Sequence, residues 1–117
     1  MIYQIAKLHI KALPDTFSSR RGVLFVASLY RVVEIFGSVR VIRRKGEIVG
    51  AISLMGKWIL TLVVDPLWQH KGIGSKLVSD LHGRRYVYTQ KQSVGFYEKM
   101  GFVRIAILGK TIFLWRK

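Results

Sequence analysis

A short stretch of the chain, "QHKGIGSKL" at residues 69–77, has the composition of an anion-binding loop. Gly72 and Gly74 stand one residue apart, and Lys71 directly precedes them. Glycines let the backbone approach a ligand closely, and the free N–H groups at a helix start attract phosphate. The spacing fits neither the dinucleotide fingerprint, which needs a glycine where Leu77 stands, nor the Walker loop. Taken alone, the G-x-G pattern is equally compatible with an ordinary surface loop.

The segments on either side of this loop predict a strand and a helix. "KWILTLVVD", residues 57–65, is a continuous apolar run and predicts a strand that is buried on both faces. After the loop, apolar residues recur at helical spacing until Gly83, which is a typical helix terminator. They are Ile73, Leu77, Val78 and Leu81. The glycines are therefore predicted at a strand-to-helix junction, where phosphate oxygens can reach backbone amides.

The remaining patterns predict a single mixed domain over residues 1–117, of the α/β (α+β) class. Apolar residues at helical spacing predict one helix that ends at Pro14 and a second one from Val23 to Val33. Lys45-Gly46 lies between two extended segments, which is a hairpin signal. "RYVYT" predicts a strand, "SVGFYEKMG" a helix, and the segments around Gly109-Lys110 two closing strands. The predicted order is α, α, β, β, β, α, β, α, β, β.

Composition excludes several classes of protein. The chain has no cysteine, so it has no disulfide framework, thiolate metal site or cysteine nucleophile. The three histidines show no metal-ligand spacing, so no metal is expected. No apolar run reaches the roughly 18 residues of a membrane span. The lack of cysteine suits a reducing compartment, and the expected location is the cytoplasm. The net charge of +14 is spread along the chain. It fits a solvated basic surface, and it leaves non-specific binding of nucleic acid open.

Two motifs in order resemble the GNAT superfamily of N-acetyltransferases. "LVVDPLWQHKGIGSKLV" contains the Gln/Arg-x-x-Gly-x-Gly/Ala loop of that family, here Gln69, Gly72 and Gly74. "FYEKMGF" is similar to its Tyr-Glu-Lys-x-Gly-Phe helix end, here from Tyr97 to Phe102. "AKLHIKALPDTFSSRRG" also looks like the substrate-side helices of many members. The resemblance implies the acyl-CoA N-acyltransferase fold, with a central mixed, mostly antiparallel sheet flanked by helices.

The resemblance also implies acetyl-CoA as cosubstrate, no metal, and a set of site residues. The loop amides would hold the pyrophosphate, and the strand before the loop would splay from "RYVYT" and pair with the pantetheine arm. The implied cofactor-binding residues are Leu62, Val63, Val64, Gln69, His70, Lys71, Gly72, Ile73, Gly74, Ser75 and Gln90. Tyr97 would be the catalytic acid that protonates the departing thiolate. A phenol suits this role because its pKa of about 10 is near that of a thiol.

The chain departs from the family pattern at three points. Gln90 stands where many relatives have asparagine, seven residues before the tyrosine. The apolar strand has no carboxylate to act as general base, and Thr61 is its only polar residue. Glu34, Glu47 and Asp65 are the nearest acidic residues, and none of them can be assigned from sequence. The leading strand of the family is also missing, so a homodimer in which a second subunit supplies an edge strand stays open.

The function expected from these patterns is transfer of an acetyl group to a primary amine of a small molecule or protein. With six acidic residues in the chain, a strongly anionic pocket is hard to build, so a polycationic acceptor is not expected. Two alternatives stay open. One is a coenzyme A binding regulatory module without turnover. The other is a nucleic-acid or ribosome-associated basic protein on the same fold.

Overall fold

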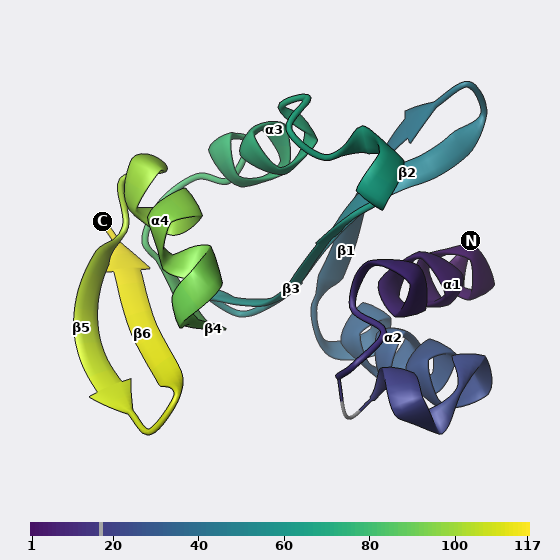
Figure 1. Ribbon diagram of the computed structural model, residues 1–117, viewed down its shortest axis with the longest axis horizontal. Helices are drawn as coiled ribbons and strands as arrows, with labels where there is room; N and C mark the ends of the chain where they lie inside the picture. Colours follow the sequence, from purple (N-terminus) through teal and green to yellow (C-terminus); the bar gives the residue numbers. More distant parts are fainter. Residues whose placement is uncertain (17) are drawn as a thin grey trace.

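The computed structural model describes residues 1–16 and 18–117, and its elements follow the predicted order (Figure 1). The helices are α1 Ile2–Ala12, α2 Val23–Phe36, α3 Ile73–Ser79 and α4 Lys91–Lys99. The strands are β1 Ser38–Arg44, β2 Glu47–Met55, β3 Trp58–Val64, β4 Arg85–Gln90, β5 Val103–Leu108 and β6 Thr111–Arg116. The described residues also form two short 3₁₀ helices, η1 Ser19–Arg21 and η2 Pro66–Trp68.

The strands form one six-stranded sheet in the order β1-β2-β3-β4-β6-β5. Every neighbouring pair is antiparallel except β3 and β4, which confirms the predicted mixed, mostly antiparallel class. β3 and β4 pair only through Trp58 with Tyr86 and Ile59 with Val87. Beyond these two pairs the strands part, and Figure 1 shows them diverging into two halves of the molecule. The predicted splay of β3 from "RYVYT" is thus present.

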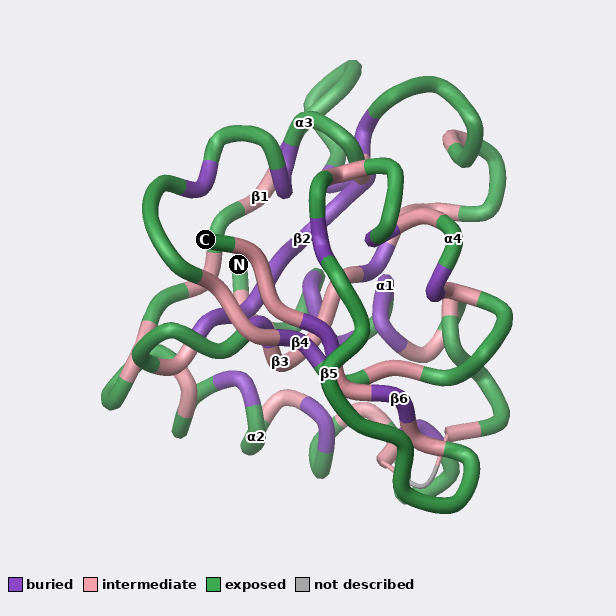
Figure 2. The backbone as a smooth tube through the Cα atoms, turned by 90° about the vertical axis from the view of Figure 1, so that its left-hand side faces the viewer, coloured by how far each residue is buried: buried purple, intermediate pink, exposed green. Residues whose placement is uncertain are grey.

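Helices cover both faces of the first half of the sheet and one face of the second. Helices α1 and α2 pack on one face of β1–β3, α3 packs on the opposite face, and α4 packs on β4 and β6 (Figure 1). Two clusters of buried side chains result, one under α1 and α2 and one shared by α3 and α4. Figure 2 shows the buried segments concentrated along the central strands, while β5 is exposed along its whole length.

A β-bulge in β3 changes which face its side chains occupy. Ser53 pairs with Thr61 and Leu54 pairs with Ile59, so Leu60 is one extra residue in β3. An extra residue breaks the alternation of the strand. Ile59 therefore joins the cluster under α3 and α4, whereas Val63 joins the cluster under α1 and α2.

The structure corrects two of the predicted features. β3 is buried on both faces only in part, because Leu60, Thr61 and Leu62 stay partly exposed where β4 has left the strand. Helix α3 ends at Ser79 and not near Gly83, although Leu81 beyond its end is still buried. In the described part of the chain, no helix is long and apolar enough to cross a membrane.

Candidate active site

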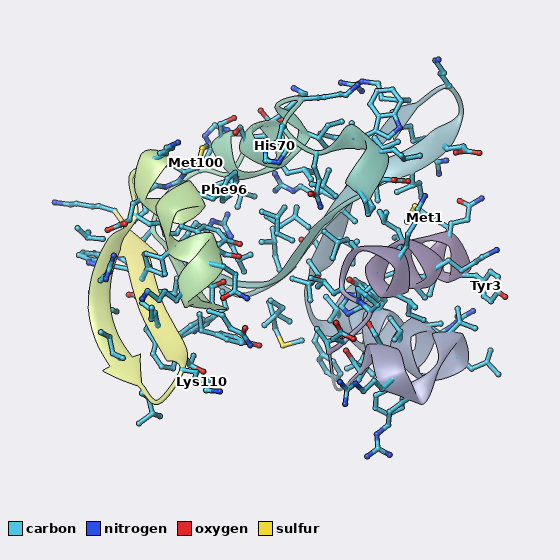
Figure 3. The ribbon with its side chains drawn as sticks, in the orientation of Figure 1. Met1, Tyr3, His70, Phe96, Met100 and Lys110 are labelled. Atoms are coloured by element: carbon cyan, nitrogen blue, oxygen red, sulfur yellow. The ribbon has the colours of Figure 1, made fainter. Side chains whose placement is uncertain are left out.

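A cleft of about 750 Å³ opens where β3 and β4 part. Its walls come from β3, the loop from Trp68 to Ser75, the second half of β4 and helix α4. The end of α1 also reaches it through Ala12 and Leu13. Figure 3 shows Phe96 on the side of α4 that faces α3, with His70 on the loop nearby. Segments that are far apart in the sequence thus surround one space large enough for a cofactor-sized ligand.

Most of the site residues expected from sequence line this cleft. They are Leu62, Val63, Val64, Gln69, His70, Gly72, Ile73, Gly74, Ser75 and Tyr97. Lys71 and Gln90 are not among the lining residues. The Lys71 ammonium lies 5.5 Å from the centre of the Trp68 ring. Gln90 is exposed at the N-terminal end of α4, where its side-chain oxygen accepts a hydrogen bond from Gln92 at 3.1 Å.

The glycine loop has the backbone geometry of a helix start that is open to a ligand. Gly72 is the N-cap of α3, with φ of 83°, and His70 also has a positive φ, 62°. Only glycine adopts this region without strain, so His70 is an uncommon residue there. The first amides of a helix have no carbonyl partner within it. Ile73, Gly74 and Ser75 therefore present N–H groups at the cleft.

Gly74 lies where the loop comes closest to α4. A Cβ atom at this position would lie 3.5 Å from the Phe96 ring and 3.7 Å from a methyl group of Val64. These are ordinary van der Waals distances, so an added methyl fits the protein itself. It would, however, occupy part of the cleft between the loop and α4.

The free edge of β3 is the second feature of the cleft. From Leu62 to Val64 the strand pairs with β2 on one side, and on the other it has no strand partner among residues 1–16 and 18–117. The Val64 carbonyl accepts a hydrogen bond from the Gln69 side-chain amide at 3.3 Å. An extended ligand with amide groups can bind such an edge as an added strand would. Gln69 would then have to release this carbonyl.

Tyr97 is the one phenol of the cleft that is almost fully buried, with 5 % of its surface exposed. Its ring packs edge-to-face against Phe96 at 5.1 Å and against Phe102 at 5.5 Å. Burial raises the pKa of Tyr97 well above its ordinary value, so the phenol keeps its proton at neutral pH. The Tyr97 hydroxyl forms no hydrogen bond with a described residue. Among the described residues, however, every fully buried polar side-chain atom has a hydrogen-bond partner. The exposed part of Tyr97 must therefore include the hydroxyl.

No aspartate or glutamate lines the cleft within residues 1–16 and 18–117. Asp65, just after β3, accepts hydrogen bonds from the Leu67 N–H at 2.9 Å and from Lys11 at 3.0 Å. Burial raises the pKa of Asp65, but these two partners outweigh that effect and leave the pKa below its ordinary value. Asp65 is thus an ionised, paired carboxylate, and Glu34 and Glu47 are exposed on α2 and β2. None of the three acidic residues nearest in sequence therefore lines the cleft.

Several lining residues were missed by the sequence analysis. Thr89, Gln92, Ser93 and Phe96 come from the end of β4 and from α4. A signal for part of this set was present, because Ser93 precedes Tyr97 by four residues and so shares its helix face. In the described part of the chain, no group of three or more histidine or acidic side chains could hold a metal ion.

Fold and site together define an acyltransferase fold, in which a mixed sheet opens between two parallel strands beside a glycine loop. Solved structures share it. A protein from Pyrococcus horikoshii aligns with a TM-score of 0.83 at 18 % identity, covering 99 % of this chain and 89 % of its own. PaiA N-acetyltransferase from Thermoplasma acidophilum, in complex with coenzyme A, aligns with 0.76 at 17 %, covering 99 % and 92 %. An aminoglycoside 6'-N-acetyltransferase complexed with coenzyme A aligns with 0.79 at 16 %, covering 97 % and 87 %.

The sequence itself assigns the family. The family model described as an acetyltransferase (GNAT) domain matches residues 20–104, which include both the glycine loop and Tyr97. The chain belongs to the GNAT acetyltransferase family, as its motifs predicted. A search of curated proteins found no match.

Proposed function

We propose that this chain is an acetyl-CoA-dependent N-acetyltransferase that moves the acetyl group directly to a primary amine. The observation that carries the proposal is that the glycine loop, the free edge of β3 and the Tyr97 phenol all line one cleft. Acyl transfer from a thioester needs a place for the donor, a neutral amine and a proton for the departing thiolate. The glycine loop and the edge of β3 offer a place for the donor, and Tyr97 offers a proton for the thiolate.

The residues present fit coenzyme A as the donor's carrier. The amides of Ile73, Gly74 and Ser75 would hold the pyrophosphate, because a helix start with an open approach favours anions. The edge of β3 from Leu62 to Val64 would bind the amide-bearing pantetheine arm. The thioester supplies an activated acetyl group. Tyr97 would then hold the proton that the sulfur takes.

Calorimetry and a thiol-release assay test the proposal together. Titration with acetyl-CoA and with coenzyme A is expected to show saturable binding of both. Release of free thiol from acetyl-CoA is expected only when a primary amine is added. Binding without amine-dependent release would contradict the transferase proposal. It would support the second candidate, a coenzyme A binding module without turnover, which the lack of a carboxylate base in the described cleft favours.

The affinity for coenzyme A is expected to fall as salt is added. The ligand is a polyanion, Lys99 lines the cleft, and Lys71 and Lys76 flank the glycine loop. Asp80 pairs with Lys76 at 3.3 Å, but both side chains are more than half exposed, so this pair neutralises little. From about 50 to about 500 mM sodium chloride, Kd should rise roughly fivefold, or about 1 kcal/mol. A Kd from calorimetry that does not change with salt would argue against a charge-assisted phosphate site.

The preferred acceptor is expected to be a neutral or anionic amine and not a polycation. Beyond the lack of acidic lining residues among those described, the cleft carries Lys99, and the chain has a net charge of +14. A second or third positive charge on the acceptor would thus meet repulsion without a partner. In steady-state assays, kcat/KM for spermidine or kanamycin should be at least about tenfold below that for glutamate or an acidic peptide N-terminus. The reverse preference would overturn this acceptor class.

A further inference from the structure

A row of hydrogen-bonded side chains crosses the interior from the surface to the cleft. His9 Nδ1 lies 2.8 Å from the Tyr30 hydroxyl, which lies 3.1 Å from the Thr61 hydroxyl. Thr61 also bonds Ser53 on the neighbouring strand, and His9 Nε2 lies 3.4 Å from the Ser18 hydroxyl. These residues come from α1, α2, β3, β2 and the segment before η1. The row therefore exists only in the folded chain.

The two ends of this row are accessible and its middle is buried. Thr61 lines the cleft and is partly exposed, and Ser18 at the other end is also partly exposed. Between them, His9 is 5 % and Tyr30 is 3 % exposed. With the proton of neutral His9 on Nε2, its Nδ1 can accept from Tyr30, and Tyr30 can accept from Thr61. That arrangement is an unbroken path for a proton from the cleft to His9.

The acceptor amine needs such a path because the part of the cleft described above offers no carboxylate base. From this geometry we infer that His9 accepts, through Tyr30 and Thr61, the proton that the acceptor amine loses during acetyl transfer. The inference rests on the proposed function. It assigns a role to three residues that belong to neither the glycine loop nor the Tyr97 helix.

The proton balance of the reaction closes with this relay. The amine nitrogen forms the new N–C bond and carries one proton too many. Thr61 takes that proton and passes its own to Tyr30, which passes its own to His9. The C–S bond of the thioester breaks, and the sulfur takes the proton of Tyr97. His9 then releases its proton toward Ser18 and solvent, and Tyr97 recovers one from solvent.

The surroundings of His9 keep it ready to accept a proton. The polar groups that face it are Tyr30 of α2, Ser18 and, through Tyr30, Thr61 of β3 and Ser53 of β2. Burial lowers the pKa of His9 below its ordinary value of 6.5. Burial raises the pKa of Tyr30 to about 12, so its hydroxyl stays protonated at neutral pH and transfers a proton only when it receives another. His9 is therefore neutral at pH 7.

Substitutions along the row test the relay, with glycinamide and methoxyamine as probe amines. His9→Gln keeps an acceptor for the Tyr30 hydroxyl but cannot take a proton, and Thr61→Val cuts the row at the cleft. Each should lower kcat/KM for glycinamide by on the order of 10²-fold, while Thr61→Ser stays close to wild type. The double variant should lose no more than either single one, because both break the same path. Affinity for coenzyme A should not change.

The pH profile separates a relay from a merely structural network. Methoxyamine is a weak base that stays uncharged around neutral pH, so a loss of rate below pH 6.5 belongs to the protein. The wild type should lose activity as His9 is protonated, and His9→Gln should lack this acidic limb. His82→Gln is the matched control, because His82 is exposed. This variant should lose activity at acidic pH as the wild type does.

The relay is wrong if the wild type transfers acetyl groups and either His9→Gln or Thr61→Val keeps the same rate and the same pH profile. That result would leave the proposed transferase activity intact. No transfer to either amine by the wild type would overturn both. Thermal unfolding of each variant shows whether it is folded. If His9→Gln does not fold, Thr61→Val against Thr61→Ser decides, because the two differ in one hydroxyl at the cleft.

Discussion

Replacing Tyr97 by phenylalanine is expected to lower kcat for acetyl transfer by about 10²–10⁴-fold, with little change in KM for acetyl-CoA. In the proposed role the phenol would donate its proton only as the thiolate forms, so the lost interaction would belong to the transition state and not to binding. The ring keeps its packing against Phe96 and Phe102, so the fold should be unaffected. Steady-state kinetics under conditions where chemistry limits turnover measure the effect.

The pH dependence of the wild type gives a second check on Tyr97. A general acid works only in its protonated form, and burial raises the pKa of Tyr97 above its ordinary value of 10.0. Tyr97 should therefore stay protonated, and cause no loss of activity, up to at least pH 10. A loss of activity that starts near neutral pH and disappears in Tyr97→Phe would contradict this assignment.

Tyr88→Phe is the matched control for Tyr97→Phe. Tyr88 also lines the cleft, but it is 46 % exposed on β4. Removing its hydroxyl should leave kcat close to that of the wild type. If Tyr97→Phe is fully active when chemistry limits turnover, Tyr97 is a packing residue. The cofactor site would then stand without it.

Replacing Gly74 by valine is expected to weaken coenzyme A binding by about a hundredfold. The new side chain would fill the space between Val64 and the Phe96 ring, in the cleft that the glycine loop lines. Losing two hydrogen bonds to a charged phosphate costs about 3 kcal/mol, which corresponds to roughly 10² in Kd. Calorimetry measures the affinity, and urea unfolding checks that the variant is folded. An unchanged Kd in a folded variant would refute the phosphate site.

Gly95→Val is the matched control for Gly74→Val. Gly95 is also a helical glycine, and a Cβ atom there meets no neighbour within 4 Å. This variant should bind coenzyme A as the wild type does. Gly72 is a poorer test position, because its φ of 83° strains any other residue by about 1–2 kcal/mol. A loss of binding at Gly72 would be mixed with a loss of stability.

The sequence by itself determined the order of the elements and the position of the glycine loop. Period 3.6 for helices, continuous apolar runs for strands, and Gly or Pro at their ends are local signals that short segments carry. The same holds for the two motifs that predicted the GNAT family, because each lies within one strand-to-helix or helix-to-strand junction. A homodimer, binding of nucleic acid and a cytoplasmic location remain predictions.

Only the tertiary structure decided how β3 serves the site. The extra residue Leu60 and the early parting from β4 depend on pairing with β2 and β4, which periodicity does not encode. The chain also contains no local sign that Lys71 turns to Trp68 and Gln90 to Gln92. The partners of such exposed side chains depend on the positions of neighbouring side chains, which are fixed only in the folded chain.

The hydrogen-bonded row from His9 to Thr61 is the clearest case of this division. His9 and Tyr30 are 21 residues apart in sequence, and Tyr30 and Thr61 are 31 apart. In the sequence, Tyr30 stands as one more residue on an apolar helix face, and Thr61 as the single polar residue of an apolar strand. Burial makes each of these polar groups find a partner, because an unpaired one would cost about 1–3 kcal/mol. Which partner each group finds is set by the packing of α1 and α2 on the sheet.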